Sequence, residues 1–246
     1  MTDGKIPQIT LAFWVMKICA TTLGETAGDL LSMTLDVGYA VSSLILIGLF
    51  AATLAGQLAA RTYHPFLYWA VILSTSTAGT TMSDFMDRTL GLGYAKGSLL
   101  LVTILLLILG YWRHTGASLS VQNIRSRKVE IFYWAAILFS NTLGTALGDF
   151  LADDSGFGFA GGALAIGSLL ALIVAAYYGT HISRTLLFWL AFVLTRPFGA
   201  TMGDVLTKTQ DKGGLGFGTV GSSTLLAALL IFLIMLTSKN KNAASA

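Results

Sequence analysis

Five acidic side chains interrupt segments that are otherwise apolar or rich in small residues: Glu25, Asp29, Asp84, Asp149 and Asp204. Inside a bilayer each ionised carboxylate costs about 2.5–3.5 kcal/mol on insertion scales, so residues of this kind serve structure or function. Carboxylate oxygens bind hard cations such as Mg²⁺, Ca²⁺ and Mn²⁺, and carboxylates can also carry protons. The five acids therefore predict a site for a divalent cation that is coupled to protons.

The four aspartates belong to a repeat. Each stands fifteen positions after a tryptophan, in the series Trp14, Trp69, Trp134 and Trp189, and an aromatic residue precedes every tryptophan. Small residues stand ten and fourteen positions after each tryptophan: Gly24, Gly28, Gly79, Ser83, Gly144, Gly148, Gly199 and Gly203. Small residues at this spacing predict close helix packing. The tryptophans are expected to anchor the helices at the cytoplasmic membrane interface.

Each repeat continues through a glycine–aromatic pair into a second apolar run; the pairs are Gly38-Tyr39, Gly93-Tyr94, Gly158-Phe159 and Gly216-Phe217. Charged residues make up only 11% of the chain, and hydrophobic residues 54%. This composition predicts an all-α polytopic membrane protein with eight transmembrane helices, arranged as four parallel two-helix repeats. We expect one transmembrane domain over residues 1–246, with repeats at about 9–60, 66–113, 131–179 and 185–238.

The basic residues predict the orientation in the membrane. Nine Lys and Arg residues lie at the termini or in loops that follow the second helix of a repeat, against four on the opposite side. This bias predicts a multi-pass protein of the bacterial inner membrane with both termini in the cytoplasm. The net charge of +3 is scattered along the chain, which argues against nucleic-acid binding. The single cysteine, Cys19, excludes an internal disulfide and any multi-cysteine metal site.

The first helix of each repeat carries a polar face that includes the aspartate, whereas the second helix has none. Polar residues in a bilayer face other helices or a wet cavity, so the first helices should form the interior and the second helices should face lipid. The predicted transport pathway comprises Lys17, Thr22, Thr26, Thr77, Thr80, Thr81, Asn141, Thr145, Arg196 and Thr201. Lys17 and Arg196 break the fourfold pattern, and each is expected to pair with a buried carboxylate. In an alternative interpretation, Arg196 lines the pathway.

Four tandem two-helix repeats, each with a tryptophan and a G-x-x-x-[GS]-D element, resemble a bacterial inner-membrane family known as a repeat of unknown function. The resemblance covers almost the whole chain and implies the four-repeat membrane architecture, but no substrate. In addition, the segment from Glu25 to Asp29 is similar to the E-x-G-D signature of a family of manganese and calcium exchangers. Its spacing is one residue longer, and no Lys/Arg-Ser/Thr pair follows it.

The sequence favours a small secondary transporter that exports a divalent cation of the Mn, Mg or Ca type in exchange for protons. The alternative is a non-transporting structural or sensory membrane protein whose buried acids hold the helix bundle together. Enzymatic activity is not expected, because Gly148-Asp149 matches only part of the G-x-G-D element of intramembrane aspartyl proteases. We expect no cofactor; the bilayer, a small cation and protons are the expected partners. The oligomeric state is left open.

Overall fold

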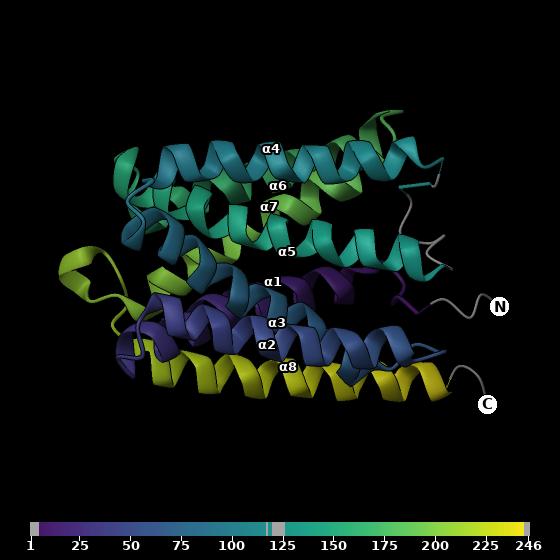
Figure 1. Cartoon of the computed structure of the whole chain (residues 1–246), viewed down its shortest axis with the longest axis horizontal. Helices are drawn as coiled ribbons and strands as arrows, with labels where there is room; N and C mark the ends of the chain where they lie inside the picture. The colour runs from purple at the N-terminus through teal and green to yellow at the C-terminus, as the bar shows by residue number, and fades with distance from the viewer. Residues whose placement is uncertain (1–4, 117, 120–125, 244–246) are drawn as a thin grey trace.

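Each sequence repeat folds into two helices that run in opposite directions along the bundle (Figure 1). The computed structural model describes residues 5–116, 118–119 and 126–243. Within these residues the α-helices are α1 Leu11–Asp29, α2 Tyr39–Ala59, α3 Pro65–Asp84, α4 Tyr94–His114, α5 Arg127–Asp149, α6 Gly158–Gly179, α7 Arg184–Thr207 and α8 Gly218–Ala243. The predicted all-α class and the predicted two helices in each repeat are confirmed.

The four odd-numbered helices form a closed ring. Helix α1 packs against α3 and α7, and α5 packs against the same two helices from the other side. The even-numbered helices lie outside this ring, and each packs mainly on the odd helix of the next repeat: α2 on α3, α4 on α5, α6 on α7, and α8 back on α1. The repeats are therefore related by rotation about the long axis of the bundle, as the sequence predicted.

Burial separates the two sets of helices. The apolar windows of α5 and α7 are 67% and 56% buried, whereas those of α2, α4, α6 and α8 are only 17–22% buried. This confirms that the first helix of each repeat forms the interior. In the described residues six helices are long and apolar enough to cross a membrane, as in a multi-pass membrane protein. Helices α1 and α3, which would complete the predicted eight, are not apolar enough to meet this criterion, because they carry many polar residues that face the interior of the ring.

Glycines bring neighbouring odd helices into close contact. Gly24 lies against Ser76, and a β-carbon added at Gly79 would come within 2.9 Å of the Asn141 backbone. The contacts continue around the ring: Gly28 meets Thr80, Gly144 meets Arg196, Gly148 meets Ala200, Gly199 meets Thr21, and Gly203 meets Glu25. In each contact a glycine of one repeat accepts a side chain of the next. Ser83 differs, because it is buried and donates a hydrogen bond to Asp87 in its own repeat, at 3.2 Å.

The aspartates mark a change of helix type. Helices α1, α3 and α5 end at their aspartates and continue as five-residue π-helical turns: η1 Leu30–Thr34, η2 Phe85–Thr89 and η4 Phe150–Asp154. Helix α7 instead runs on to Thr207 and is followed by a 3₁₀ turn, η5 Gln210–Lys212. Because π-helical turns are frequent at functional sites, the level of the aspartates is a candidate functional site.

The turn before each even helix contains two residues with positive φ, separated by one position. These residues are Asp36 and Gly38, Gly91 and Gly93, Gly156 and Gly158, and Gly216 and Gly218, with φ between 54° and 78°. The fourth predicted glycine–aromatic pair, Gly216-Phe217, is therefore shifted by two residues, because α8 begins at Gly218. The longer loop around η5 in the fourth repeat accounts for the shift.

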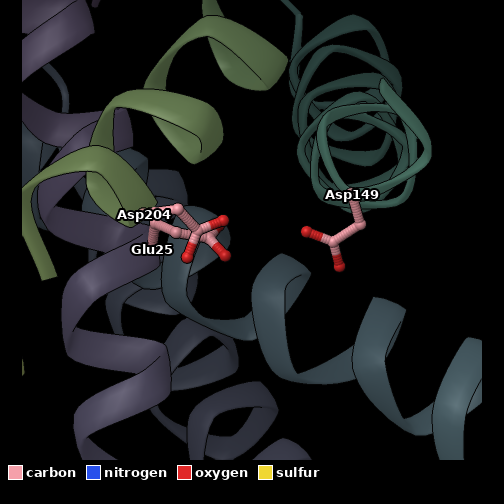
Figure 2. A group of neighbouring side chains, drawn as sticks. All are labelled: Glu25, Asp149 and Asp204. Carbon is pink, nitrogen blue, oxygen red and sulfur yellow. The ribbon is translucent and has the colours of Figure 1, made fainter. Parts of the chain in front are cut away.

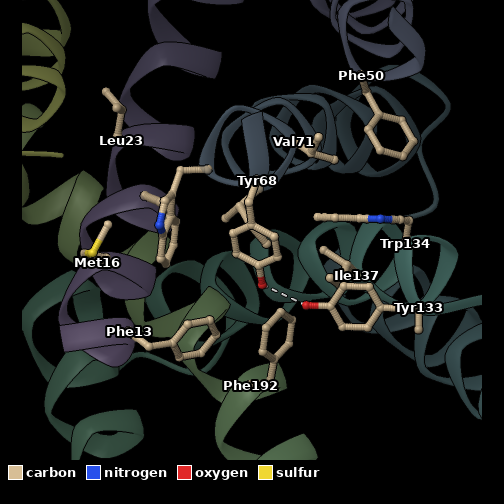
Figure 3. Close-up of a cluster of buried hydrophobic side chains, with 14 of the residues drawn as sticks. Phe13, Met16, Leu23, Phe50, Tyr68, Val71, Tyr133, Trp134, Ile137 and Phe192 are labelled. Atoms are coloured by element: carbon tan, nitrogen blue, oxygen red, sulfur yellow. Dashed lines mark hydrogen bonds between the residues drawn. The ribbon is translucent and has the colours of Figure 1, made fainter. Parts of the chain in front are cut away.

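The predicted role as interfacial anchors is wrong for three of the four tryptophans. Trp69, Trp134 and Trp189 are buried, because each packs on the aromatic residue that precedes the tryptophan of the previous repeat. The ring centroids of Tyr68 and Trp134 are 5.6 Å apart, and the hydroxyls of Tyr68 and Tyr133 are hydrogen bonded at 2.8 Å (Figure 3). We call this buried aromatic cluster at the N-terminal ends of the odd helices the aromatic end of the ring.

Candidate cation site

The interior of the ring is built in layers. Equivalent residues of the four repeats lie at the same level of the ring. Residues four positions apart on one helix are about 6 Å apart along its axis, so successive layers are separated by about one helical turn. The acidic layer comprises Asp29, Asp84, Asp149 and Asp204. One turn towards the aromatic end lies the central layer, which comprises Glu25, Thr80, Thr145 and Ala200. All eight of these residues are buried.

Three of the predicted acids lie together. Glu25, Asp149 and Asp204 each offer an oxygen atom, and these three atoms are all within 4.8 Å of one another. Figure 2 shows Asp149 on α5 opposite Glu25 and Asp204, which come from α1 and α7. Metal–oxygen bonds of about 2.3–2.6 Å place ligands on opposite sides of a Ca²⁺ up to about 5 Å apart. The three carboxylates therefore have the spacing and chemistry to bind one hard cation.

Two basic residues that sequence reasoning assigned only to loops pair with the acidic layer. Arg88 Nε lies 2.9 Å from Asp84 Oδ1, and its Nη2 lies 3.2 Å from Asp149 Oδ2. Lys208 Nζ lies 3.1 Å from both Asp29 Oδ2 and Asp204 Oδ1. Each base thus joins the aspartates of two adjacent repeats, and all four aspartates are ion-paired.

A sequence signal for these two bases existed. Arg88 and Lys208 both stand four residues after the aspartate of their own repeat, a spacing that brings side chains together on one helix face. The first and third repeats carry Met33 and Asp153 at the equivalent position. A basic residue in alternate repeats is the pattern expected if each base serves its own aspartate and the aspartate of a neighbouring repeat.

Arg196 pairs with a carboxylate, as predicted. Its Nη2 lies 2.9 Å from Glu25 Oε2 and donates hydrogen bonds of 2.6 Å to the hydroxyls of Thr80 and Thr145. The same two threonines donate to Glu25 Oε2, at 3.2 and 3.3 Å. The guanidinium group, which is carried by α7, therefore contacts α1, α3 and α5 at the centre of the ring. Its side chain is completely buried.

The prediction that Lys17 pairs with a carboxylate is wrong. Lys17 is fully buried, and its ammonium group lies 4.3 Å from the ring centroid of Phe192. Its Nζ has no hydrogen-bond partner among the described residues. Glu25 is eight residues further along α1, which corresponds to about 12 Å. At the level of Lys17 the other odd helices contribute Ile72, Ile137 and Phe192 instead of acids.

The remaining predicted pathway residues lie elsewhere on the odd helices. The hydroxyls of Thr22, Thr77, Thr81 and Thr201 donate to carbonyls of their own helices. Two others contact a neighbouring helix: Thr26 accepts a hydrogen bond from Ser223 of α8 at 2.9 Å, and the amide of Asn141 donates to Thr75 of α3 at 2.9 Å. Thr80, Thr145 and Arg196 are thus the predicted pathway residues that contact Glu25.

The bases of the acidic layer are partly exposed, unlike the base of the central layer. The side chains of Arg88 and Lys208 are 33% and 21% exposed, whereas that of Arg196 is 0% exposed. At the opposite end of the ring, the interior is filled by the packed side chains of the aromatic end. The acidic layer is therefore nearer to the surface at the ends of the odd helices that carry the aspartates.

The fold and the site together define a multi-pass helical membrane protein whose four repeats close into a ring around a charged centre. The chain belongs to the family described as Repeat of Unknown Function (DUF347), whose model matches residues 12–63, 67–118, 132–183 and 187–241. These four matches follow the four helix pairs and confirm the resemblance found in the sequence. No curated protein and no solved structure matches the chain.

Proposed function

We propose that this protein is a small secondary transporter that exports a divalent cation in exchange for protons. The observation that carries the proposal is the group formed by Glu25, Asp149 and Asp204, three buried carboxylates with oxygen atoms within 4.8 Å of one another. Three acids from three different helices bind a cation best when those helices are close together, so movement of one repeat can change the affinity. Mn²⁺, Mg²⁺ and Ca²⁺ all accept such oxygen ligands.

The charge of the acidic layer supports exchange against protons. Its four aspartates and two bases, Arg88 and Lys208, leave a charge of −2 when all six are ionised. One divalent cation or two protons neutralise that charge equally well. Because an uncompensated charge inside a membrane is costly, the site should be filled by one or the other. We propose an exchange of one divalent cation for two protons.

In this proposal all eight helices cross the bacterial inner membrane, with α1 and α3 shielded from lipid by their neighbours in the bundle. The nine-to-four distribution of basic residues supports cytoplasmic termini, and with this orientation the acidic layer would lie towards the outside. Reporter fusions at Ala246 and Asn123, both outside the described residues, should report the cytoplasm. A periplasmic signal at either position would reverse the proposed direction of export.

A structural role for the acids is the second candidate, and the ion pairs favour it. Each of the four aspartates and Glu25 has a basic partner. Ion pairs between adjacent repeats would hold the ring together without any transported ion. In that case Asp→Asn changes would alter stability but leave no transport to lose.

Flux measurements in proteoliposomes separate the two candidates. We expect a pH gradient to drive Mn²⁺ movement through the wild type, and Asp149→Asn or Asp204→Asn to reduce the rate at least about tenfold while the protein remains monodisperse. Asp211→Asn is the matched control, because Asp211 is exposed in η5 on the same side of the bundle; it should transport normally. Absence of flux in the wild type for Mn²⁺, Mg²⁺ and Ca²⁺ alike would leave the structural role as the better account.

A further inference from the structure

The ion pairs and the proposed cation site use the same carboxylates. Asp149 belongs to the group of three acids and also pairs with Arg88. Asp204 belongs to that group and also pairs with Lys208. A divalent cation that binds here must therefore compete with a guanidinium group for one acid and with an ammonium group for another.

We infer that Arg88 and Lys208 are built-in cations that pair with the aspartates in the ion-free state and, when a divalent cation binds, release the carboxylates that bind it while staying beside the acidic layer. The inference rests on the proposed function and adds a regulatory step to it. Between transport events the bases compensate two of the four negative charges of the aspartates, and in the proposed exchange two protons compensate the others.

The surroundings of the three site bases support this division of roles. Arg196 is fully buried and is held by Glu25, Thr80 and Thr145, so its release would break contacts with three helices. Arg88 and Lys208 are partly exposed and lie beyond the aspartates, in the turn η2 and immediately after α7. Release of either side chain would therefore break fewer buried contacts than release of Arg196.

The two outer bases are held differently. The Arg88 guanidinium lies 5.9 and 5.6 Å from the ring centroids of Tyr39 and Tyr94, and it donates to the Tyr39 hydroxyl at 3.4 Å. Lys208 has its two carboxylates and, within the described residues, no aromatic ring beside it. Cation–π contacts contribute about 0.5–1 kcal/mol at exposed sites. Lys208 is therefore held less tightly than Arg88, so an entering cation should displace Lys208 first.

Mn²⁺ binding to the purified full-length protein tests the inference without any transport assay. We expect Lys208→Gln to lower the Kd for Mn²⁺ about three- to tenfold in calorimetric titrations, because the competing ion pair is gone. Arg88→Gln should also bind more tightly than the wild type, and Lys208→Arg should restore the competition and remove the gain. Lys212→Gln is the matched control, since it removes the same charge from an exposed position in the same loop.

The outcomes separate the inference from the function on which it rests. If the wild type binds Mn²⁺ and neither Lys208→Gln nor Arg88→Gln binds it more tightly, the inference is overturned and the transporter proposal stands. An equal gain in Lys212→Gln would reveal a general effect of surface charge and would also overturn it. If no form binds Mn²⁺, Mg²⁺ or Ca²⁺, both proposals fail. Binding by Lys208→Gln where the wild type binds weakly or not at all would support both.

Discussion

The two ends of the ring are built by the same four helices, but they differ in polarity, charge and exposure. At the aromatic end, packed rings exclude water and the interior carries few polar groups (Figure 3). At the acidic layer, four aspartates and two bases are joined by ion pairs, and the bases reach the surface. Only about fifteen residues, or roughly 22 Å of helix, separate the two regions. In the transport proposal, the aromatic end would therefore have to open for an ion to pass through the ring.

Arg196 lies between the two ends, and its removal should give the largest loss of stability. Arg196→Met leaves Glu25 as an unpaired buried charge, which costs about 3–5 kcal/mol when one partner of a buried pair is removed. Thermal melting of the purified protein should show a large decrease in Tm. The double variant Arg196→Met/Glu25→Gln should recover most of it. A single variant as stable as the double would mean that Glu25 does not depend on Arg196 to compensate its charge.

Close contact between the odd helices should contribute to the thermal stability of the whole ring. Gly79→Ala places a methyl group within 2.9 Å of the α5 backbone, so the helices must separate, at about 1–3 kcal/mol. Gly110 of α4 has open space around it, and Gly110→Ala should be neutral or slightly stabilising. The difference in Tm between the two variants measures the packing of the ring. Similar Tm values would argue that the ring tolerates separation.

The hydrogen bond between tyrosines at the aromatic end should have the smallest effect. Tyr68→Phe leaves the buried hydroxyl of Tyr133 without its 2.8 Å partner, at about 1 kcal/mol. Tyr68→Phe/Tyr133→Phe should be closer to the wild type, because no polar group is then left unpaired. Packing of the rings, and not this bond, should keep the end closed. A marked proton leak in Tyr68→Phe proteoliposomes would contradict that expectation.

Much of the architecture was predictable because the spacing and polarity of the repeated residues indicate it directly. Tryptophan, glycine and aspartate recur at fixed spacing, and a polar face on one helix of each pair is enough to place that helix inside. The ion pairs were harder to predict. Arg88 meets Asp149 only because α3 and α5 are neighbours in the ring, and the repeat does not state the order of the helices around it.

Two other errors have a similar cause. Interfacial tryptophans are common in membrane proteins, but here each ring fits against an aromatic residue of the adjacent repeat, a contact that depends on tertiary structure. The expected partner of Lys17 was inferred from charge alone. The acids lie further along the bundle, and the level of Lys17 is filled by apolar side chains from the other three odd helices.

The packing of each even helix on the following repeat has a consequence for biosynthesis. Helix α1 ends at Asp29, and its outer neighbour α8 begins only at Gly218. At translation rates of about 5–20 residues per second, the ribosome needs roughly ten to forty seconds to make the intervening chain. For most of that time α1, with Lys17 and Glu25 on its surface, lacks α7, and for all of it α1 lacks α8. The polar surface of the first helix therefore stays without its final partners until the last repeat is made.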